Sequence, residues 1–180
     1  MTRDIVFIDT ETGGFDPEKD PLIEIALIRT SVDGSVVHDR YVTKVAIPEG
    51  MEVSEGAAAI NGYTKEAWEG APSLEDALRA VTMRIPSYSY LGGHNFINFD
   101  KPFINTNLKR VGLRWPKTQY HMADTMAMAF PLYATGKIPN VKLQTLCDYY
   151  GISNENAHQA MVDIERTVKV YKALMTPFVA

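Results

Sequence analysis

The stretch IVFIDTETGG, residues 5–14, decides the fold of this chain. Its first four residues form a continuous apolar run, which is typical of a strand buried on both faces. Asp9 and Glu11 follow two residues apart, and in a strand this spacing points both side chains to the same face. Two carboxylates this close repel each other unless a cation or a shared proton intervenes. On this segment alone, a strand that runs out into a solvated acidic loop is the slightly better interpretation.

The segments around this strand predict an α/β domain with a mixed five-stranded sheet flanked by helices. The further predicted strands are residues 22–28, 36–45, 88–91 and 120–123, with Asp33-Gly34 as the turn between the first two. The predicted helices are residues 74–84, 102–111, 125–133, 141–150 and 159–175. With 180 residues, of which 46% are hydrophobic, we expect one domain that spans residues 1–180.

Composition narrows the class of protein. The apolar runs are too short to cross a bilayer, the N-terminus lacks a signal-peptide pattern, and the single Cys147 cannot form an internal disulfide, so we expect a cytoplasmic protein with no membrane association. A net charge of -4 argues weakly against a dedicated nucleic-acid-binding protein. Residues 101–147 nevertheless carry seven basic residues and one acid, which a polyanion could approach. Taken alone, a solvated basic face is the better interpretation of that segment.

A third acid lies far from the first pair. Asp100 ends the segment GGHNFINFD, residues 92–100, whose leading glycines permit close backbone approach. Because Asp100 stands just before Pro102 at a predicted helix N-terminus, a helix cap is the ordinary interpretation and a third metal ligand is the functional one. Phe96 and Phe99 in the same segment suit either the core or contact with a base.

His158 and Asp163 form the last group. Five residues apart on one helix, they would point about 140° away from each other. We therefore expect His158 on the loop before the helix, and Asp163 one turn into it between two apolar neighbours. A lone histidine is usually an ordinary surface or core residue, but this one is the fifth member of a set, which favours a functional role.

The order of these segments resembles the DEDD exonucleases in their histidine-containing (DEDDh, DnaQ-like) branch. Residues 5–14 resemble the first exonuclease motif, residues 94–100 the second, and HQAMVD, residues 158–163, the third. This branch includes the proofreading exonuclease subunit of bacterial replicative DNA polymerase, oligoribonuclease, ribonuclease T and the TREX exonucleases. The resemblance covers nearly the whole chain, with weaker matches at residues 60–64, 124–125 and 143–152.

The resemblance implies a ribonuclease H-like fold and the removal of nucleoside 5′-monophosphates from the 3′ ends of single-stranded nucleic acid, with DNA favoured over RNA. It implies two divalent cations, Mg²⁺ or Mn²⁺, and His158 as the general base that takes a proton from the attacking water. The implied metal ligands, which are also catalytic, are Asp9, Glu11, Asp100 and Asp163. The substrate-binding residues implied by matching position are Thr10, Phe15, Asn61, Asn95 and Phe96.

Two positions depart from the family pattern. His94 stands six residues before Asp100, where the family commonly has five, and Asn61 stands where the proofreading subunit typically has histidine. Both affect the expected nucleotide pocket, and neither removes a ligand. The alternatives are an oligoribonuclease-like RNA exonuclease and a non-catalytic, polymerase-associated nucleic-acid-binding module. A DNA polymerase is a candidate partner, although the lack of an attached polymerase domain favours a small free-standing nuclease.

Overall fold

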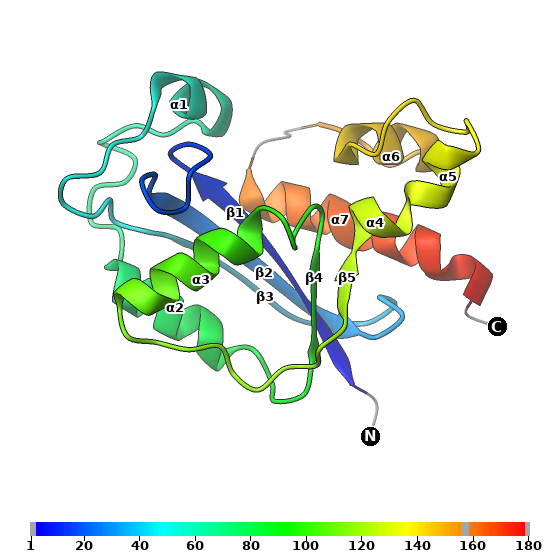
Figure 1. Cartoon of the computed structure of the whole chain (residues 1–180), viewed down its shortest axis with the longest axis horizontal. Helices are drawn as coiled ribbons and strands as arrows, with labels where there is room; N and C mark the ends of the chain where they lie inside the picture. The colour runs from blue at the N-terminus through cyan, green and yellow to red at the C-terminus, as the bar shows by residue number, and fades with distance from the viewer. Residues whose placement is uncertain (1–2, 156–158, 179–180) are drawn as a thin grey trace.

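The computed structural model describes residues 3–155 and 159–178, which form one five-stranded mixed sheet covered by helices (Figure 1). The strands stand in the order β3-β2-β1-β4-β5. Their bounds are Asp4–Thr12 for β1, Leu22–Ser31 for β2, Val37–Lys44 for β3, Tyr90–Gly93 for β4 and Met122–Asp124 for β5. The strands β1, β2 and β3 are antiparallel neighbours, whereas β1, β4 and β5 run parallel. The predicted α/β fold with a mixed five-stranded sheet is therefore confirmed.

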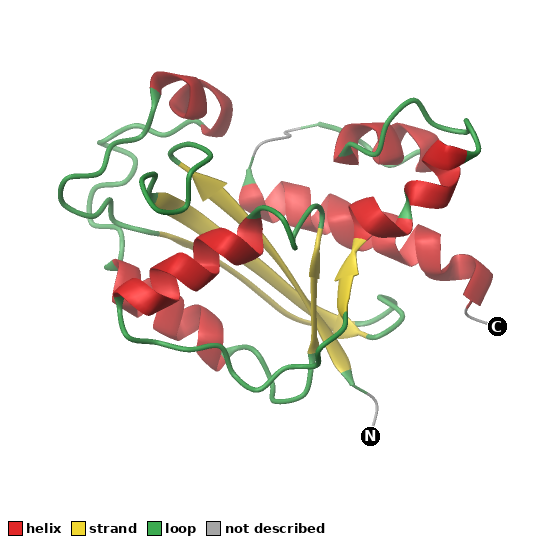
Figure 2. Cartoon of the chain, in the orientation of Figure 1, coloured by secondary structure: helices red, strands yellow, loops and turns green. Residues whose placement is uncertain are grey.

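Helices cover both faces of the sheet, as Figure 2 shows. Their bounds are Glu55–Asn61 for α1, Leu74–Met83 for α2, Asp100–Arg110 for α3, Thr125–Met128 for α4, Phe130–Ala134 for α5, Leu143–Tyr150 for α6 and Ala160–Met175 for α7. The apolar side chains of α2 and α3 pack on one face of the sheet, and those of α7 pack on the other. Leu146 and Cys147 of α6, together with Ala129 and Ile138 on either side of α5, are buried against Val170 and Leu174 of α7. None of the helices formed by the described residues combines the length and apolar character that a membrane span requires.

Two helical predictions need correction. Residues 125–133 form two short helices rather than one, because Pro131 lacks an N–H and its ring crowds the preceding turn, so that α4 ends at Met128 and α5 starts at Phe130. The helix α1 is absent from the predicted elements. It is nonetheless well capped, since Ser54 Oγ accepts a hydrogen bond from the Ala57 N–H (3.2 Å) and Gly62 adopts the left-handed conformation after the last turn.

Close backbone approach at the centre of the sheet requires the glycines of β4. A Cβ at Gly93 would lie 2.8 Å from the Ile8 carbonyl oxygen and 2.8 Å from the Phe96 Cβ. A Cβ at Gly92 would lie 2.7 Å from the Ala123 carbonyl oxygen. Gly93 therefore lets the segment that leads to Asp100 pass directly beside β1, and Gly92 lets β4 lie close against β5, as their place in the sequence suggests.

Candidate active site

Side-chain alternation along β1 decides which way its acids point. Val6 and Ile8 pack with α2 and α3, while Ile5 and Phe7 pack with α7. Asp9 and Glu11 continue the second series and therefore face the layer of α7. Both carboxylates are half-buried.

The helix α7 brings Asp163 to the same face, because Asp163 lies in its first turn. Arg166, one turn further along, donates from Nη1 to Asp163 Oδ1 at 2.6 Å and from Nη2 to Asn154 Oδ1 at 2.7 Å. The guanidinium is almost fully buried. It therefore links the acid on α7 to the loop that follows α6, and it selects the orientation of the Asp163 carboxylate.

Asp100 comes from the other layer, at the N-terminus of α3, and is buried. Thr10 fixes it: the backbone N–H and the Oγ1–H of Thr10 both donate to Asp100 Oδ1, at 2.8 and 2.7 Å. Thr10 can do this because it points to the opposite face of β1 from its acidic neighbours. The predicted substrate-binding residue Thr10 thus holds a carboxylate in place.

The four predicted acids line a single cleft of about 330 Å³. The described residues that line it are Asp9, Thr10, Glu11, His94, Asn95, Phe99, Asp100, Met126, Lys142, Leu143 and Asp163. The acids come from three elements that are far apart in sequence, and only the fold brings them together. His158 lies outside the described residues, so its predicted role as a general base stays a prediction.

Burial and mutual repulsion raise the pKa values of three of these acids. Burial raises the pKa of Asp9 well above its usual value, and the charges of Asp100 and Glu11 raise it further. The pKa of Glu11 rises to about 7, first through burial and then through Asp163 and its other acidic neighbours. Burial also raises the pKa of Asp100 to about 7, although the two Thr10 hydrogen bonds oppose this shift. The cleft concentrates negative charge that a cation would neutralise.

The donor set fits a hard divalent cation. Carboxylate oxygens are the ligands that Mg²⁺ and Mn²⁺ prefer, and the cleft is lined by four carboxylates. The described side chains contain no ready-made cluster of three His, Cys, Asp or Glu residues that could already hold an ion. The fit therefore rests on the chemistry of the donors, on their shared cleft and on the raised pKa values of Asp9, Glu11 and Asp100.

A fifth acid, Glu24, was missed from the sequence. It stands directly across from Glu11 in the β1–β2 pairing. Burial raises the pKa of Glu24, whereas the backbone N–H of Ala160, the first residue of α7, and the charge of Lys44 lower it. Only the strand register reveals this residue, because nothing in its local sequence marks it.

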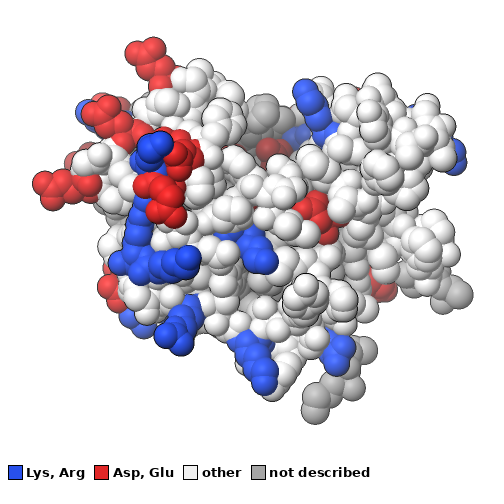
Figure 3. Space-filling view, viewed as in Figure 1, with Lys and Arg blue, Asp and Glu red and all other residues white. Residues whose placement is uncertain are grey.

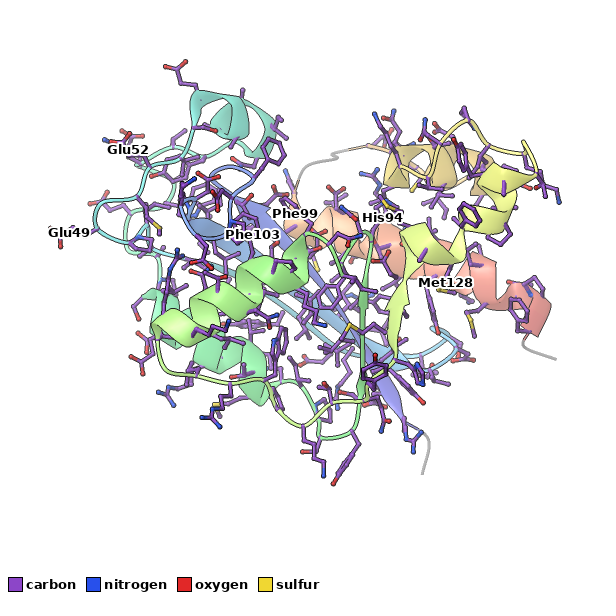
Figure 4. All side chains as sticks on the ribbon, in the orientation of Figure 1. Glu49, Glu52, His94, Phe99, Phe103 and Met128 are labelled. Atoms are coloured by element: carbon purple, nitrogen blue, oxygen red, sulfur yellow. The ribbon has the colours of Figure 1, made fainter. Side chains whose placement is uncertain are left out.

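His94 lies in the wall of the cleft, beside α4 (Figure 4), and Asp124 holds the loop from which it comes. The Nδ1 of His94 lies 2.9 Å from Oγ1 of Thr125, and burial lowers the His94 pKa to about 4, so the ring is neutral at neutral pH. Asp124 accepts hydrogen bonds from the backbone N–H groups of Asn95, Ile97 and Met126, at 3.0 to 3.1 Å. These bonds tie the β4–α3 loop to the start of α4.

An apolar pocket of about 310 Å³ adjoins the cleft on the side of α1. Phe15, which is 87% exposed, and Asn61 both line it, as does Phe99. Asn61 donates from Nδ2 to the Thr12 carbonyl oxygen at 3.1 Å, which fixes α1 against the end of β1. Phe96 is instead fully buried in the core, so the prediction that it contacts substrate is wrong, and Phe99 offers the aromatic surface.

Most of the basic residues in segment 101–147 do not line the cleft. Lys109 and Arg110 stand at the far end of α3 from Asp100, about 15 Å along the helix, and Figure 3 shows Lys and Arg side chains gathered in that region. Trp115 packs against the core and donates to Asn105 Oδ1. Of the seven basic residues in segment 101–147, Lys142 lines the catalytic cleft.

A sheet of this order, with an acidic cleft at the end of its central strand, defines a ribonuclease H-like fold. The exonuclease family model matches residues 6–171. The chain belongs to the DnaQ-like exonuclease family. This family depends on divalent metal ions.

The relatives include DNA polymerase III proteins and a ribonuclease. The chain is 32% identical over 167 residues to the PolC-type DNA polymerase III of Thermotoga petrophila, with 92% of this chain and 11% of that protein covered. It is 31% identical to the ribonuclease T of Shewanella frigidimarina, covering 92% of this chain and 79% of that protein. It is 26% identical to the DNA polymerase III subunit epsilon of Aquifex aeolicus, covering 92% and 77%. The chain spans about 11% of the length of the first curated relatives it matches.

Solved structures agree with this fold. The Escherichia coli exonuclease I complex with a dT13 oligonucleotide superimposes with a TM-score of 0.86 at 22% identity, covering 97% of this chain and 41% of that one. A zinc-bound form of an exonuclease I complex with single-stranded DNA superimposes with a TM-score of 0.83 at 23% identity, with the same coverage.

Proposed function

We propose that the chain is a metal-dependent 3′→5′ exonuclease of the DEDDh type, which releases nucleoside 5′-monophosphates from single-stranded nucleic acid. The observation that carries this proposal is the meeting of Asp9, Glu11, Asp100 and Asp163 in one cleft. An apolar pocket of nucleotide size opens beside them under α1. The pocket would take the terminal nucleotide between Phe15 and Phe99, and its phosphate would then lie against the acids.

The four carboxylates would hold two divalent cations, for which we propose Mg²⁺ or Mn²⁺. When bound, these ions activate a water molecule and neutralise the charge that develops on the phosphate. Thr10 keeps the Asp100 carboxylate oriented, and Arg166 does the same for Asp163. His158, at the position of the family histidine, would accept the proton of the attacking water as its oxygen bonds to phosphorus and the 3′ oxygen of the preceding nucleotide departs.

We favour DNA as the substrate, because the PolC-type and epsilon-subunit relatives are parts of DNA polymerases. The same relatives support a DNA polymerase as a partner. Ribonuclease T, at 31% identity, supports the alternative that the chain acts on RNA. We further propose that residues 1–180 act as one exonuclease domain in the cytoplasm, since the acids come from β1, α3 and α7 and the single Cys147 forms no disulfide.

Digestion of end-labelled oligonucleotides tests the proposal. The chain is incubated with 5′-labelled single-stranded DNA, duplex DNA and single-stranded RNA in Mg²⁺, Mn²⁺ or EDTA. We expect a ladder of products shortened from the 3′ end, with metal present and single strands preferred. Asp9→Asn is expected to remove the activity while the melting temperature stays within a few degrees. The proposal fails if no strand is shortened with Mn²⁺, or if Asp9→Asn digests as fast as the parent chain.

A further inference from the structure

We propose that a groove beside α4 and α5 binds the unpaired bases that lie beyond the first nucleotide on the 5′ side of the scissile phosphate. This proposal rests on the exonuclease function above and extends it. The groove has a volume of about 550 Å³ and presents little polar surface. Its lining includes Ile97, Met126, Phe130, Tyr133 and Val141.

The groove is continuous with the catalytic cleft. Met126 lines both hollows, just as Thr10, Glu11 and Phe99 line both the catalytic cleft and the pocket under α1. Three adjoining hollows therefore lead from α1 to α5: the apolar pocket under α1, the acidic cleft and the apolar groove. Figure 1 shows α1 on one side of the end of β1 and α4 to α6 on the other. A strand with its last nucleotide under α1 and its scissile phosphate at the acids would leave through the third hollow.

The groove presents aromatic surface that the fold does not use. Phe130 is 60% exposed and Tyr133 is 49% exposed, and both lie on the short helix α5, which buries none of its residues. Stacking on such rings suits single strands, because every base has an aromatic face. Figure 3 shows little charge over α4 and α5, which matches an apolar surface for bases.

Charges at the junction of cleft and groove suit a phosphodiester backbone. Lys142 lines the catalytic cleft, and its neighbour Val141 lines the groove, so a cation stands where the strand would pass from one to the other. The acid of the groove, Asp124, is 4% exposed, and its two oxygens accept three backbone hydrogen bonds. Its carboxylate therefore faces the loop and not the strand. Unpaired nucleic acid is the occupant that combines stacking bases with a phosphate at this cation.

Substrate length provides the kinetic test. A thymidine dinucleotide can fill only the terminal pocket and the cleft, whereas a decathymidylate also reaches the groove. For the Phe130→Ala and Tyr133→Ala variants we expect kcat/KM on the decamer to fall about 5- to 150-fold, which corresponds to the ~1–3 kcal/mol of one lost stack. On the dinucleotide we expect no change. Tyr149→Ala, which removes a ring of similar exposure (44%) outside the groove, serves as the matched control.

Two further variants separate stacking from general apolar contact. Phe130→Trp keeps an aromatic face and should keep decamer activity, whereas Phe130→Leu keeps an apolar side chain without one and should lose it. Equal losses on the dinucleotide and the decamer, or no loss on either, would overturn the proposal. If all groove variants cleave the decamer at the parent rate, the groove does not bind the strand, and a protein partner would be the alternative occupant.

Equilibrium binding tests the groove apart from catalysis. Fluorescence anisotropy of a labelled decathymidylate in EDTA reports affinity without hydrolysis, and we expect Kd to rise in Phe130→Ala but not in Tyr149→Ala. If Phe130→Ala weakens binding of the decamer but the parent chain cleaves nothing with Mn²⁺, the exonuclease proposal fails, whereas binding of the strand in the groove is supported. If it cleaves normally and groove variants bind as tightly as the parent, the groove proposal fails alone.

Discussion

At the scale of single residues, the site combines acids that repel each other with a few partners that hold them. Thr10 anchors Asp100 through two hydrogen bonds, and Arg166 anchors Asp163 through one. The pKa values of Asp9 and Glu11, raised by burial and by acidic neighbours, show that this anchoring does not relieve the repulsion. The arrangement of the cleft therefore suits a bound divalent cation, which would neutralise these carboxylates.

Replacement of Arg166 should show whether its buried ion pair with Asp163 contributes more to the free energy of unfolding than an exposed ion pair does. Arg166→Gln leaves the Asp163 carboxylate without its buried guanidinium, and breaking a buried pair typically costs about 3–5 kcal/mol. The exposed pair Arg79–Glu75 has the same 2.6 Å separation, yet Arg79→Gln should cost no more than about 0.5 kcal/mol. Urea unfolding of the two variants makes the comparison. If both variants lose similar amounts of unfolding free energy, burial does not make the Arg166–Asp163 pair more stabilising than the exposed pair.

The general-base role assigned to His158 predicts a change in the pH profile. His158→Ala should lower kcat about 10²- to 10⁴-fold, because the attacking water loses its proton acceptor. The parent chain, at saturating Mn²⁺, should gain activity as pH rises through the histidine range near about 6.5, and the variant should lack that step. Calorimetric titration with Mn²⁺ should give the same stoichiometry for both. Turnover near the parent rate at about pH 8 would remove His158 from the mechanism.

At the scale of elements, the approach of β4 to β1 is the tightest constraint. Gly93→Ala would place its Cβ 2.8 Å from the Ile8 carbonyl oxygen, so we expect a loss of about 1–3 kcal/mol in the free energy of unfolding. Gly56→Ala is the matched control, because Gly56 lies in α1, its backbone is not left-handed, and a Cβ added there would meet no atom within 4 Å. There the substitution should stabilise the helix by up to about 1 kcal/mol. A Gly93→Ala protein as stable as the parent would contradict the close packing of β4 against β1.

The elements also show how far sequence patterns reach. Strands and long helices are predictable because apolar periodicity and caps such as Ser73 are local properties. The break between α4 and α5 was missed, although Pro131 marks it, because the apolar pattern runs through it. Glu24 and Arg166 were missed for another reason: their roles depend on strand register and on contacts between α7 and the loop after α6. The choice of Phe96 as a substrate-binding residue failed for a similar reason, since two aromatic residues three apart on a loop give no clue to which one is buried.

At the scale of the whole molecule, the acidic cleft links stability to pH. The folded-state pKa values of Glu11 and Asp100 lie at about 7, above their ordinary values, so the folded chain binds more protons than the unfolded chain. Their contribution to stability is present at low pH and is lost as pH rises through about 7. His94, with its pKa lowered to about 4, acts in the opposite direction, but above about pH 6.5 its effect is small because the unfolded side chain is then also mostly neutral.

The melting temperature of the metal-free chain should therefore fall by several degrees between about pH 6.5 and about pH 8. Mn²⁺ at about 100 times its Kd should add about 2.7 kcal/mol at the upper end of this interval, because it binds the folded chain and neutralises the acids. Differential scanning calorimetry in EDTA and in Mn²⁺ measures both effects, and Glu11→Gln should flatten the pH dependence. A melting temperature that rises over this interval would refute the charge distribution assigned to the cleft.

The alternation of side chains along β1 limits how this chain can diverge. Asp9 and Glu11 face α7 while Thr10 faces α3, and both halves of the site depend on that parity. A single-residue insertion or deletion between Ile5 and Asp9 would exchange the two sets, sending the acids toward α3 and the hydroxyl toward α7. Individual residues in this strand can be substituted, but its length can change only by two residues at a time, because a change of two keeps each side chain on its own face. In descendants of this chain we therefore expect substitutions in this strand, but no insertion or deletion of a single residue.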